Sequence, residues 1–150
     1  MPPTQIYVAA IIAAAGRGRR LGAPVPKQLL AIAGRTILER AVAAVAASDR
    51  IDEIVVAAPP ELAMAPEALP GLGKPLRIVT GGERRQDSVA RAFEAVSSAA
   101  DVIVIHDAAR PFVSAALLAR TIDAAVEAGA AVAAVPARDT VKRTAAAGDT

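Results

Sequence analysis

A glycine-rich loop close to the N-terminus combines the residue types that bind phosphate. The loop reads Ala13-Ala14-Ala15-Gly16-Arg17-Gly18-Arg19-Arg20-Leu21-Gly22 and continues to Pro26-Lys27-Gln28. Small residues and glycines let backbone N–H groups approach phosphate oxygens closely, and the side chains of Arg19, Arg20 and Lys27 add positive charge. This combination predicts a binding site for a triphosphate. The alternative is a tight turn whose arginines are only solvated.

The spacing of the glycines excludes two common phosphate loops. Gly16, Gly18 and Gly22 do not form the pattern G-x-G-x-x-G, and the chain contains no G-x-x-x-x-G-K-[ST] run. Neither a Rossmann dinucleotide loop nor a Walker loop is therefore expected.

A second candidate loop begins with a glycine pair, Gly81 and Gly82. The pair lies between an expected strand and an expected helix, so its N–H groups and the positive end of the helix can meet an anion or the edge of a base. Arg85 and Ser88 follow within one turn of that helix. We expect Gly82, Arg85 and Ser88 to contact a nucleotide. The alternative is a plain strand-to-helix turn with charged residues at the surface.

A third candidate is Asp107, at the end of a strongly apolar segment. A carboxylate is costly to bury unless it meets a cation or hydrogen-bond donors, so we expect Asp107 to face a ligand cleft. His106, the only histidine, is more typical of a hydrogen-bonded structural residue at a strand end, and we assign it no catalytic role. From the residues alone, Arg110 could cap a turn or pair with an acidic neighbour.

Strand-like and helix-like segments alternate along the chain and must position these loops. Strands are expected at 6–14, 54–58, 76–79, 101–105 and 131–135, and 101–105 has the clearest pattern of a buried strand. Helices are expected at 36–48, 61–69 and 86–98, and from an N-cap at Ser114 to near Gly129. This order predicts a three-layer α/β fold with a mostly parallel, Rossmann-like sheet, which binds ligands at the carboxyl ends of its strands.

Composition sets wider bounds on the protein. A length of 150 residues favours one domain over residues 1–150, and 54% hydrophobic residues with 2% aromatics require a core of Ala, Val, Ile and Leu. The chain has no cysteine, which fits a cytoplasmic location. The net charge of +2 indicates neither a nucleic-acid nor a membrane partner. The apolar run at 6–15 lacks the preceding basic residues of a signal peptide and is shorter than a spanning helix of ~20 residues.

Four motifs, taken in order, resemble one known family. They are the Ala-Ala-Gly-x-Gly-x-Arg loop with Pro-Lys-Gln, the run Gly81 to Val89, the run His106-Asp107-Ala108-Ala109-Arg110-Pro111-Phe112, and Arg138-Asp139-Thr140-Val141-Lys142. The first is similar to the signature loop of nucleotidyltransferases. The others are similar to motifs of the 2-C-methyl-D-erythritol 4-phosphate cytidylyltransferase family of non-mevalonate isoprenoid biosynthesis.

The resemblance implies an activity and a role for each matched residue. The reaction is the transfer of CMP from CTP to 2-C-methyl-D-erythritol 4-phosphate, with release of pyrophosphate. Arg20 and Lys27 would stabilise the transition state as catalytic residues, with Mg²⁺ bridging phosphate oxygens and Asp107 as its protein ligand. The residues expected to contact the substrates are Ala14, Ala15, Gly16, Gly18, Arg19, Gly82, Arg85, Ser88, Asp107, Arg110 and Thr140.

Family members extend further than this sequence, so residues 1–150 are expected to form the N-terminal portion of the domain, and the full-length family is expected to be homodimeric. Two other functions stay open. One is a ribitol 5-phosphate cytidylyltransferase, which uses a related sugar-alcohol phosphate. The other is a non-catalytic nucleotide-binding fragment, which retains the phosphate loop without the acceptor site.

Overall fold

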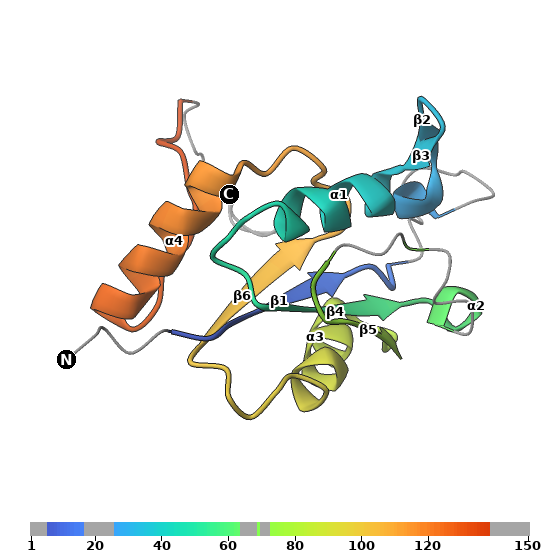
Figure 1. The fold of residues 1–150 in the computed structure, drawn as a ribbon. Helices are drawn as coiled ribbons and strands as arrows, with labels where there is room; N and C mark the ends of the chain where they lie inside the picture. The colour runs from blue at the N-terminus through green and yellow to red at the C-terminus, as the bar shows by residue number, and fades with distance from the viewer. Residues whose placement is uncertain (1–5, 17–25, 64–68, 70–72, 139–150) are drawn as a thin grey trace, which may run out of the picture.

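The centre of the fold is a parallel four-stranded sheet, seen in a computed structural model that describes residues 6–16, 26–63, 69 and 73–138. Its strands stand in the order β5 (Leu76–Thr80), β4 (Glu53–Ala58), β1 (Val8–Ala13) and β6 (Val102–Asp107). In the register, Ala13 of β1 pairs with Ala57 on one side and with Asp107 on the other. The carboxyl ends of these strands therefore meet at one edge of the sheet (Figure 1).

Helices cover both faces of the sheet and make the fold three layers thick (Figure 1). On one face, alternate residues of β1 such as Val8 and Ile12 pack with Leu38 and Val42 of α1 (Ile37–Ala46). The same face carries α4 (Ala115–Ala128), whose Ile122 joins that cluster. On the other face, Ile11, Val55 and Ala57 pack against Ala92 of α3 (Arg85–Glu94). These layers confirm the predicted α/β fold and its core of small and aliphatic side chains.

Capping residues explain where two helices begin and end. The hydroxyl of Thr36 accepts a hydrogen bond from the N–H of Glu39, and the Glu39 carboxylate accepts one from the N–H of Thr36, so α1 starts with a capping box. At α4, Ser114 accepts from the N–H of Leu117, and Gly129 ends the helix in the left-handed region at φ 84°. Both ends of α4 lie where the sequence predicted them.

The remaining described elements are short. They are the 3-10 helix η2 (Lys27–Leu29), an antiparallel hairpin of β2 (Ala31–Ile32) with β3 (Arg35–Thr36), and α2 (Pro60–Ala63). The hairpin and η2 were not predicted. Of the helix expected at 61–69, residues 61–63 belong to α2, while 64–68 lie outside the described part of the chain. The helix expected at 86–98 already ends at Glu94.

Two predictions about strands were wrong. Residues 131–135 form no strand: they pair with no described strand, and Val132 and Val135 are 88% and 87% exposed. A short apolar run such as Ala131 to Val135 becomes a strand only where a neighbouring strand completes its hydrogen bonds. The segment at 101–105 is a strand, but it is not the most buried one, because β6 lies at the edge of the described sheet and Ile105 is 50% exposed. The buried strands are β1 and β4.

Candidate functional site

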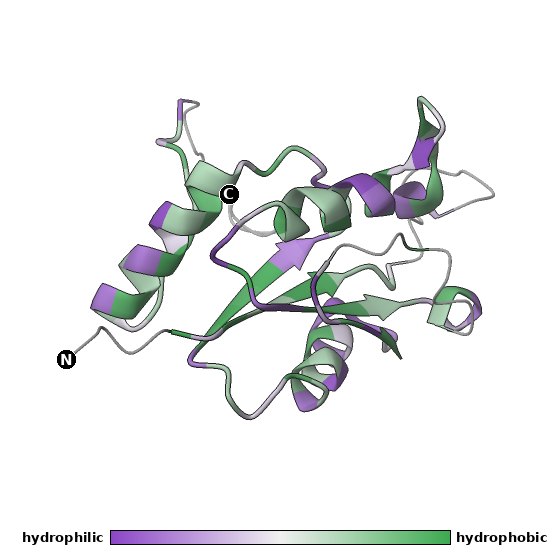
Figure 2. Ribbon diagram, viewed as in Figure 1, coloured by the Kyte–Doolittle hydropathy of each residue, from purple (hydrophilic) through white to green (hydrophobic). Residues whose placement is uncertain are grey.

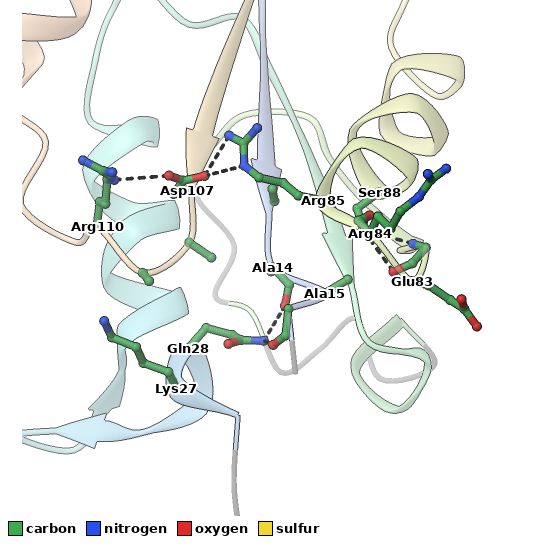
Figure 3. A pocket seen from close by; sticks show the side chains of 15 residues that line it. Ala14, Ala15, Lys27, Gln28, Glu83, Arg84, Arg85, Ser88, Asp107 and Arg110 are labelled. Atoms are coloured by element: carbon green, nitrogen blue, oxygen red, sulfur yellow. Dashed lines mark hydrogen bonds and ion pairs between the residues drawn. The ribbon is translucent and has the colours of Figure 1, made fainter. Parts of the chain in front are cut away.

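A cavity of about 580 Å³ opens at the carboxyl ends of β1, β5 and β6, where three loops meet (Figure 3). This volume is in the usual range of small-molecule sites, roughly 300–1,000 Å³. Figure 2 shows the sheet as hydrophobic along its middle and hydrophilic at the tip of β6, which borders the cavity. The lining residues are Ala13, Ala14, Ala15, Gly16, Lys27, Gln28, Gly82, Glu83, Arg84, Arg85, Ser88, Asp107, Ala108, Ala109 and Arg110.

The loop after β1 is held by hydrogen bonds to its backbone. The N–H of Ala14 donates to the carbonyl of Ala57 at 2.7 Å, which extends the pairing of β1 with β4. The side-chain amide of Gln28 donates to the carbonyl oxygens of Ala14 at 2.5 Å and of Gly16 at 2.8 Å. Since both backbone polar groups of Ala14 are engaged, Ala15 and Gly16 are better placed than Ala14 to offer N–H groups to a ligand.

Lys27 and Gln28 come from η2, on the side of the cavity opposite α3 (Figure 3). Their environments differ although they are neighbours in the chain: Lys27 is exposed, whereas Gln28 is 5% exposed. Lys27 therefore offers a solvated positive charge to a ligand, while Gln28 belongs to the wall behind the loop.

The second loop follows β5 and needs its glycines because the backbone is closely packed. A Cβ at Gly81 would lie 2.2 Å from the Cβ of Ala15, and one at Gly82 would lie 2.4 Å from the Cβ of Asp87. Ser88 is buried, and its hydroxyl accepts a hydrogen bond from the N–H of Gly82 at 3.0 Å. Gly81 thus joins the second loop to the first, and Ser88 holds Gly82 at the start of α3.

Asp107 ends β6 between two arginines (Figure 3). Its Oδ1 accepts from Nε and Nη2 of Arg85 at 2.9 and 2.8 Å, and its Oδ2 accepts from Nε of Arg110 at 3.2 Å. Burial acts to raise the pKa of Asp107, but the hydrogen bonds and charge of Arg85, together with Arg110, outweigh it and hold the pKa below its usual value. Asp107 is therefore ionised at neutral pH and joins α3 to the loop after β6.

The charge of the lining is positive. Four cationic side chains, those of Lys27, Arg84, Arg85 and Arg110, face two carboxylates, those of Glu83 and Asp107, which leaves an excess of two positive charges. A cavity with positive charge and backbone donors suits a phosphorylated ligand.

His106 has a structural contact. Its Nε2 lies 2.9 Å from the carbonyl oxygen of Arg110, so the tautomer with Nε2–H donates a hydrogen bond within the turn after β6. This contact is of the hydrogen-bonded, structural kind expected for His106 from the sequence.

The structure brings together nine of the residues expected at the site. They are Ala14, Ala15, Gly16, Lys27, Gly82, Arg85, Ser88, Asp107 and Arg110. Four others, Gly18, Arg19, Arg20 and Thr140, lie outside the described residues. Sequence reasoning did not select Gln28, Glu83 and Arg84 as site residues, although all three stand within the motifs. Gln28 is a polar residue followed by two leucines, and this position next to apolar residues was the available sign of a buried side chain at the site.

Asp107 is the carboxylate expected to hold a metal. Within the described ranges, no group of three or more His, Cys, Asp or Glu residues is placed to bind a metal ion. Likewise, no described helix is long and apolar enough to cross a membrane.

Comparison with known proteins gives consistent matches. The model of the family described as IspD: 2-C-methyl-D-erythritol 4-phosphate cytidylyltransferase matches residues 8–149. The chain is 49% identical over 137 residues to the bifunctional enzyme IspD/IspF of Anaeromyxobacter dehalogenans, covering 91% of this chain and 34% of that protein. It is 44% identical over 140 residues to the 2-C-methyl-D-erythritol 4-phosphate cytidylyltransferase of Symbiobacterium thermophilum, covering 93% of this chain and 58% of the relative.

The fold matches as well. The crystal structure of 2-C-methyl-D-erythritol 4-phosphate cytidylyltransferase from Thermus thermophilus superposes with a TM-score of 0.68 at 40% identity. The match covers 92% of this chain and 59% of the other. The chain thus spans between about a third and three fifths of the length of these relatives.

Proposed function

Because the chain belongs to the 2-C-methyl-D-erythritol 4-phosphate cytidylyltransferase family, we propose that it transfers CMP from CTP to 2-C-methyl-D-erythritol 4-phosphate and releases pyrophosphate. The observation that carries the proposal is the joint placement of three motif loops around one positively charged cavity.

The triphosphate of CTP would lie against the loop after β1. Backbone donors at Ala15 and Gly16 and the charge of Lys27 line that side of the cavity. Arg20 and Gly18, outside the described residues, are proposed to complete it, as the family motif implies. Preorganised donors and cations act on phosphoryl chemistry mainly by neutralising charge on the phosphate oxygens.

The cytosine and its ribose would lie towards the loop after β5. Gly82 and the first turn of α3 present backbone groups and the hydroxyl of Ser88 at the cavity. The hydroxyl of Ser88 accepts from the N–H of Gly82 and would position the loop, while the carbonyl oxygen of Gly82, which has two lone pairs, could accept from the amino group of a base. The close packing at Gly81 would keep the spacing of these groups constant.

The acceptor phosphate would enter from the side of Asp107 and Arg110. An oxygen of this phosphate attacks the α-phosphorus of CTP, and the bond from the α-phosphorus to the oxygen shared with the β-phosphorus breaks. The electron pair of that bond leaves with pyrophosphate, so no covalent bond to the protein forms. Lys27 and Arg20 are assigned the charge that develops on the transferring and leaving oxygens, and positioning contributes the rest.

Mg²⁺ is proposed as the cofactor, and the donor set at the cavity fits an ion that arrives with the triphosphate. A carboxylate offers about four lone-pair sites, and three N–H groups of Arg85 and Arg110 occupy Asp107, which leaves one site for a metal. Mg²⁺ is commonly held by one or two carboxylates, water and substrate phosphates, and bound in this way it would neutralise phosphate charge. Asp107 is the protein ligand we assign to it.

The dimer and the location belong to the same proposal. We expect the full-length protein to be a cytoplasmic homodimer without a nucleic-acid or membrane partner. Sedimentation of the purified protein at several concentrations tests the dimer, and a species that stays monomeric at high concentration would contradict it.

Pyrophosphate release tests the proposed reaction. The chain is incubated with CTP and Mg²⁺, and with either 2-C-methyl-D-erythritol 4-phosphate or ribitol 5-phosphate, while calorimetry measures CTP binding on the same sample. We expect release with the first acceptor. Release with ribitol 5-phosphate alone would assign the other acceptor, and CTP binding without release would indicate a nucleotide-binding fragment. Absence of CTP binding would contradict the proposal.

A further inference from the structure

Gln28 is a buried polar side chain at the cavity, and among the described residues its side chain makes hydrogen bonds to the loop after β1. Its side chain has one NH₂ group with two hydrogens, and both are used: one points to the carbonyl oxygen of Ala14 and the other to that of Gly16. The residue is 5% exposed, so these bonds do not compete with bulk water. A buried amide with both donors engaged is well fixed in place.

The element that carries Gln28 is itself anchored. The 3-10 helix η2 packs against α1, and the partly buried Leu29 joins the main hydrophobic cluster. Just after η2, the carbonyl of Leu30 accepts from the N–H of Ile37, the first residue of α1. The amide of Gln28 therefore extends from a rigid support to the loop.

The bond to Ala14 also determines the direction of a donor. A trans peptide unit points its C=O and its N–H to opposite sides, so the carbonyl of Ala14 and the N–H of Ala15 are turned together. With the carbonyl held towards Gln28, the N–H of Ala15 points away from Gln28. Ala15 lines the cavity, and the N–H of Ala14 is held by Ala57. The N–H of Ala14 belongs to the preceding Ala13–Ala14 peptide unit, so two consecutive peptide units are each held by one hydrogen bond, and the bond from Gln28 is the one that orients the Ala14–Ala15 unit.

We propose that Gln28 is a positioning residue that holds the Ala14–Ala15 peptide in the orientation that binds the phosphates of the nucleotide. It acts through the loop and not through contact with the ligand. This role rests on the proposed binding of CTP. A merely structural glutamine would stabilise the fold without changing the preference of the folded protein for a phosphorylated ligand.

Gln28→Met tests the role, since methionine has a similar length and no donor. Loss of two hydrogen bonds is expected to weaken CTP binding about tenfold, whereas binding of cytidine, which has no phosphate, stays within about twofold. Gln28→Glu should weaken CTP binding further, because a carboxylate would face two carbonyl oxygens. Gln86→Met is the matched control: Gln86 is exposed on α3 and does not line the cavity. NMR titration measures each affinity, and thermal unfolding reports stability.

The unmodified protein gives a second measurement that needs no variant to fold. The side-chain amide protons of Gln28 should exchange with solvent more slowly than those of Gln86, and CTP should slow the exchange at Gln28 further, because a ligand and a clamp that favour one loop conformation reinforce each other. Exchange at Gln28 as fast as at Gln86, or unaffected by CTP, would overturn the proposal.

The outcomes separate this inference from the proposed function. Equal CTP affinity in folded Gln28→Met and in the parent protein would overturn the role of Gln28 alone, even if the variant melts at a lower temperature. An equal loss of CTP and cytidine binding would overturn it too. A parent protein that binds no CTP would contradict the proposed function itself.

Discussion

The two sides of the cavity are held by different forces. On the β1 side, the loop is fixed by backbone pairing with Ala57 and by the buried amide of Gln28. On the β6 side, the walls are joined by Asp107 with Arg85 and Arg110, whose side chains are 60% and 76% exposed. Exposed ion pairs are weak and screened by salt, whereas buried uncharged hydrogen bonds keep their geometry. We call the β1 side, with Ala14, Ala15 and Gln28, the rigid side, and the β6 side, with Asp107 and its two arginines, the adjustable side.

The largest effect is expected on the rigid side, at Lys27. Replacing Lys27 with alanine removes a cation from the cavity without touching the bonds of Gln28. If Lys27 stabilises charge in the transition state, turnover should fall by about 100-fold to 1,000-fold, and CTP affinity by much less. Steady-state kinetics and calorimetry measure the two quantities.

Arg120→Ala is the control for Lys27→Ala, since Arg120 is an exposed cation on α4 that does not line the cavity. It should leave both quantities unchanged. A Lys27 variant that loses affinity and turnover equally would assign Lys27 to binding only, and unchanged values for both would refute the phosphate-loop assignment.

A middle-sized effect is expected where the first and second loops touch. In Gly81→Ala the new Cβ would overlap that of Ala15 and approach the hydroxyl of Ser88 to 3.0 Å. The backbone must shift to remove this overlap, and overpacking of this kind lowers the unfolding free energy by about 1–3 kcal/mol. Urea denaturation measures the loss of unfolding free energy, and CTP binding should weaken with it.

Gly129→Ala is the control. It strains a left-handed helix end far from the cavity, so it should lower stability and leave CTP affinity intact. If Gly81→Ala were as stable as the parent protein, the backbone of the rigid side would be able to shift without a measurable cost.

The smallest effect is expected on the adjustable side. Arg85→Gln removes the main partner of Asp107, so the pKa of Asp107 should rise towards its usual value. In the parent protein the folded-state pKa lies below the unfolded one, so the ion pairs stabilise the fold above about pH 4, and this stabilisation is lost as the pH falls through the folded-state pKa. Because the groups are exposed, at most about 1 kcal/mol is involved.

Carboxyl ¹³C NMR of Asp107 over an acid titration measures its pKa directly. Arg84→Gln is the matched control, because Arg84 pairs with Asp87 and not with Asp107. If Arg85→Gln left the pKa of Asp107 unchanged, or if Arg84→Gln raised it by the same amount, the ion pair with Arg85 would not be the cause of the lowered pKa.

Prediction from sequence succeeded where local patterns determine structure. The apolar spacing of α1 and the caps at Ser114 and Gly129 act within a few residues, so these elements were found. The strand expected at 131–135 failed because pairing depends on a distant neighbour. The β2–β3 hairpin was missed because two residues per strand leave no period to detect.

The site divides in the same way. The order of the motifs was enough to predict most of the lining, since loops after parallel strands converge at one edge. The sequence raised a pairing of Arg110 with an acidic neighbour as one possibility, but it did not indicate that Arg85 and Arg110 share one carboxylate, because Arg85 and Asp107 are 22 residues apart in the chain. Nor did it single out Gln28, whose partners are carbonyl groups that carry no sequence signal.

The contact of Gly81 with Ala15 also limits how the protein can change over generations. A side chain at position 81 would meet the methyl group of Ala15, so Gly81→Ala should be tolerated better once position 15 is glycine. The two positions should therefore show epistasis, which single-site mutagenesis would not reveal. Libraries that seek a different nucleotide preference should therefore randomise positions 15 and 81 together.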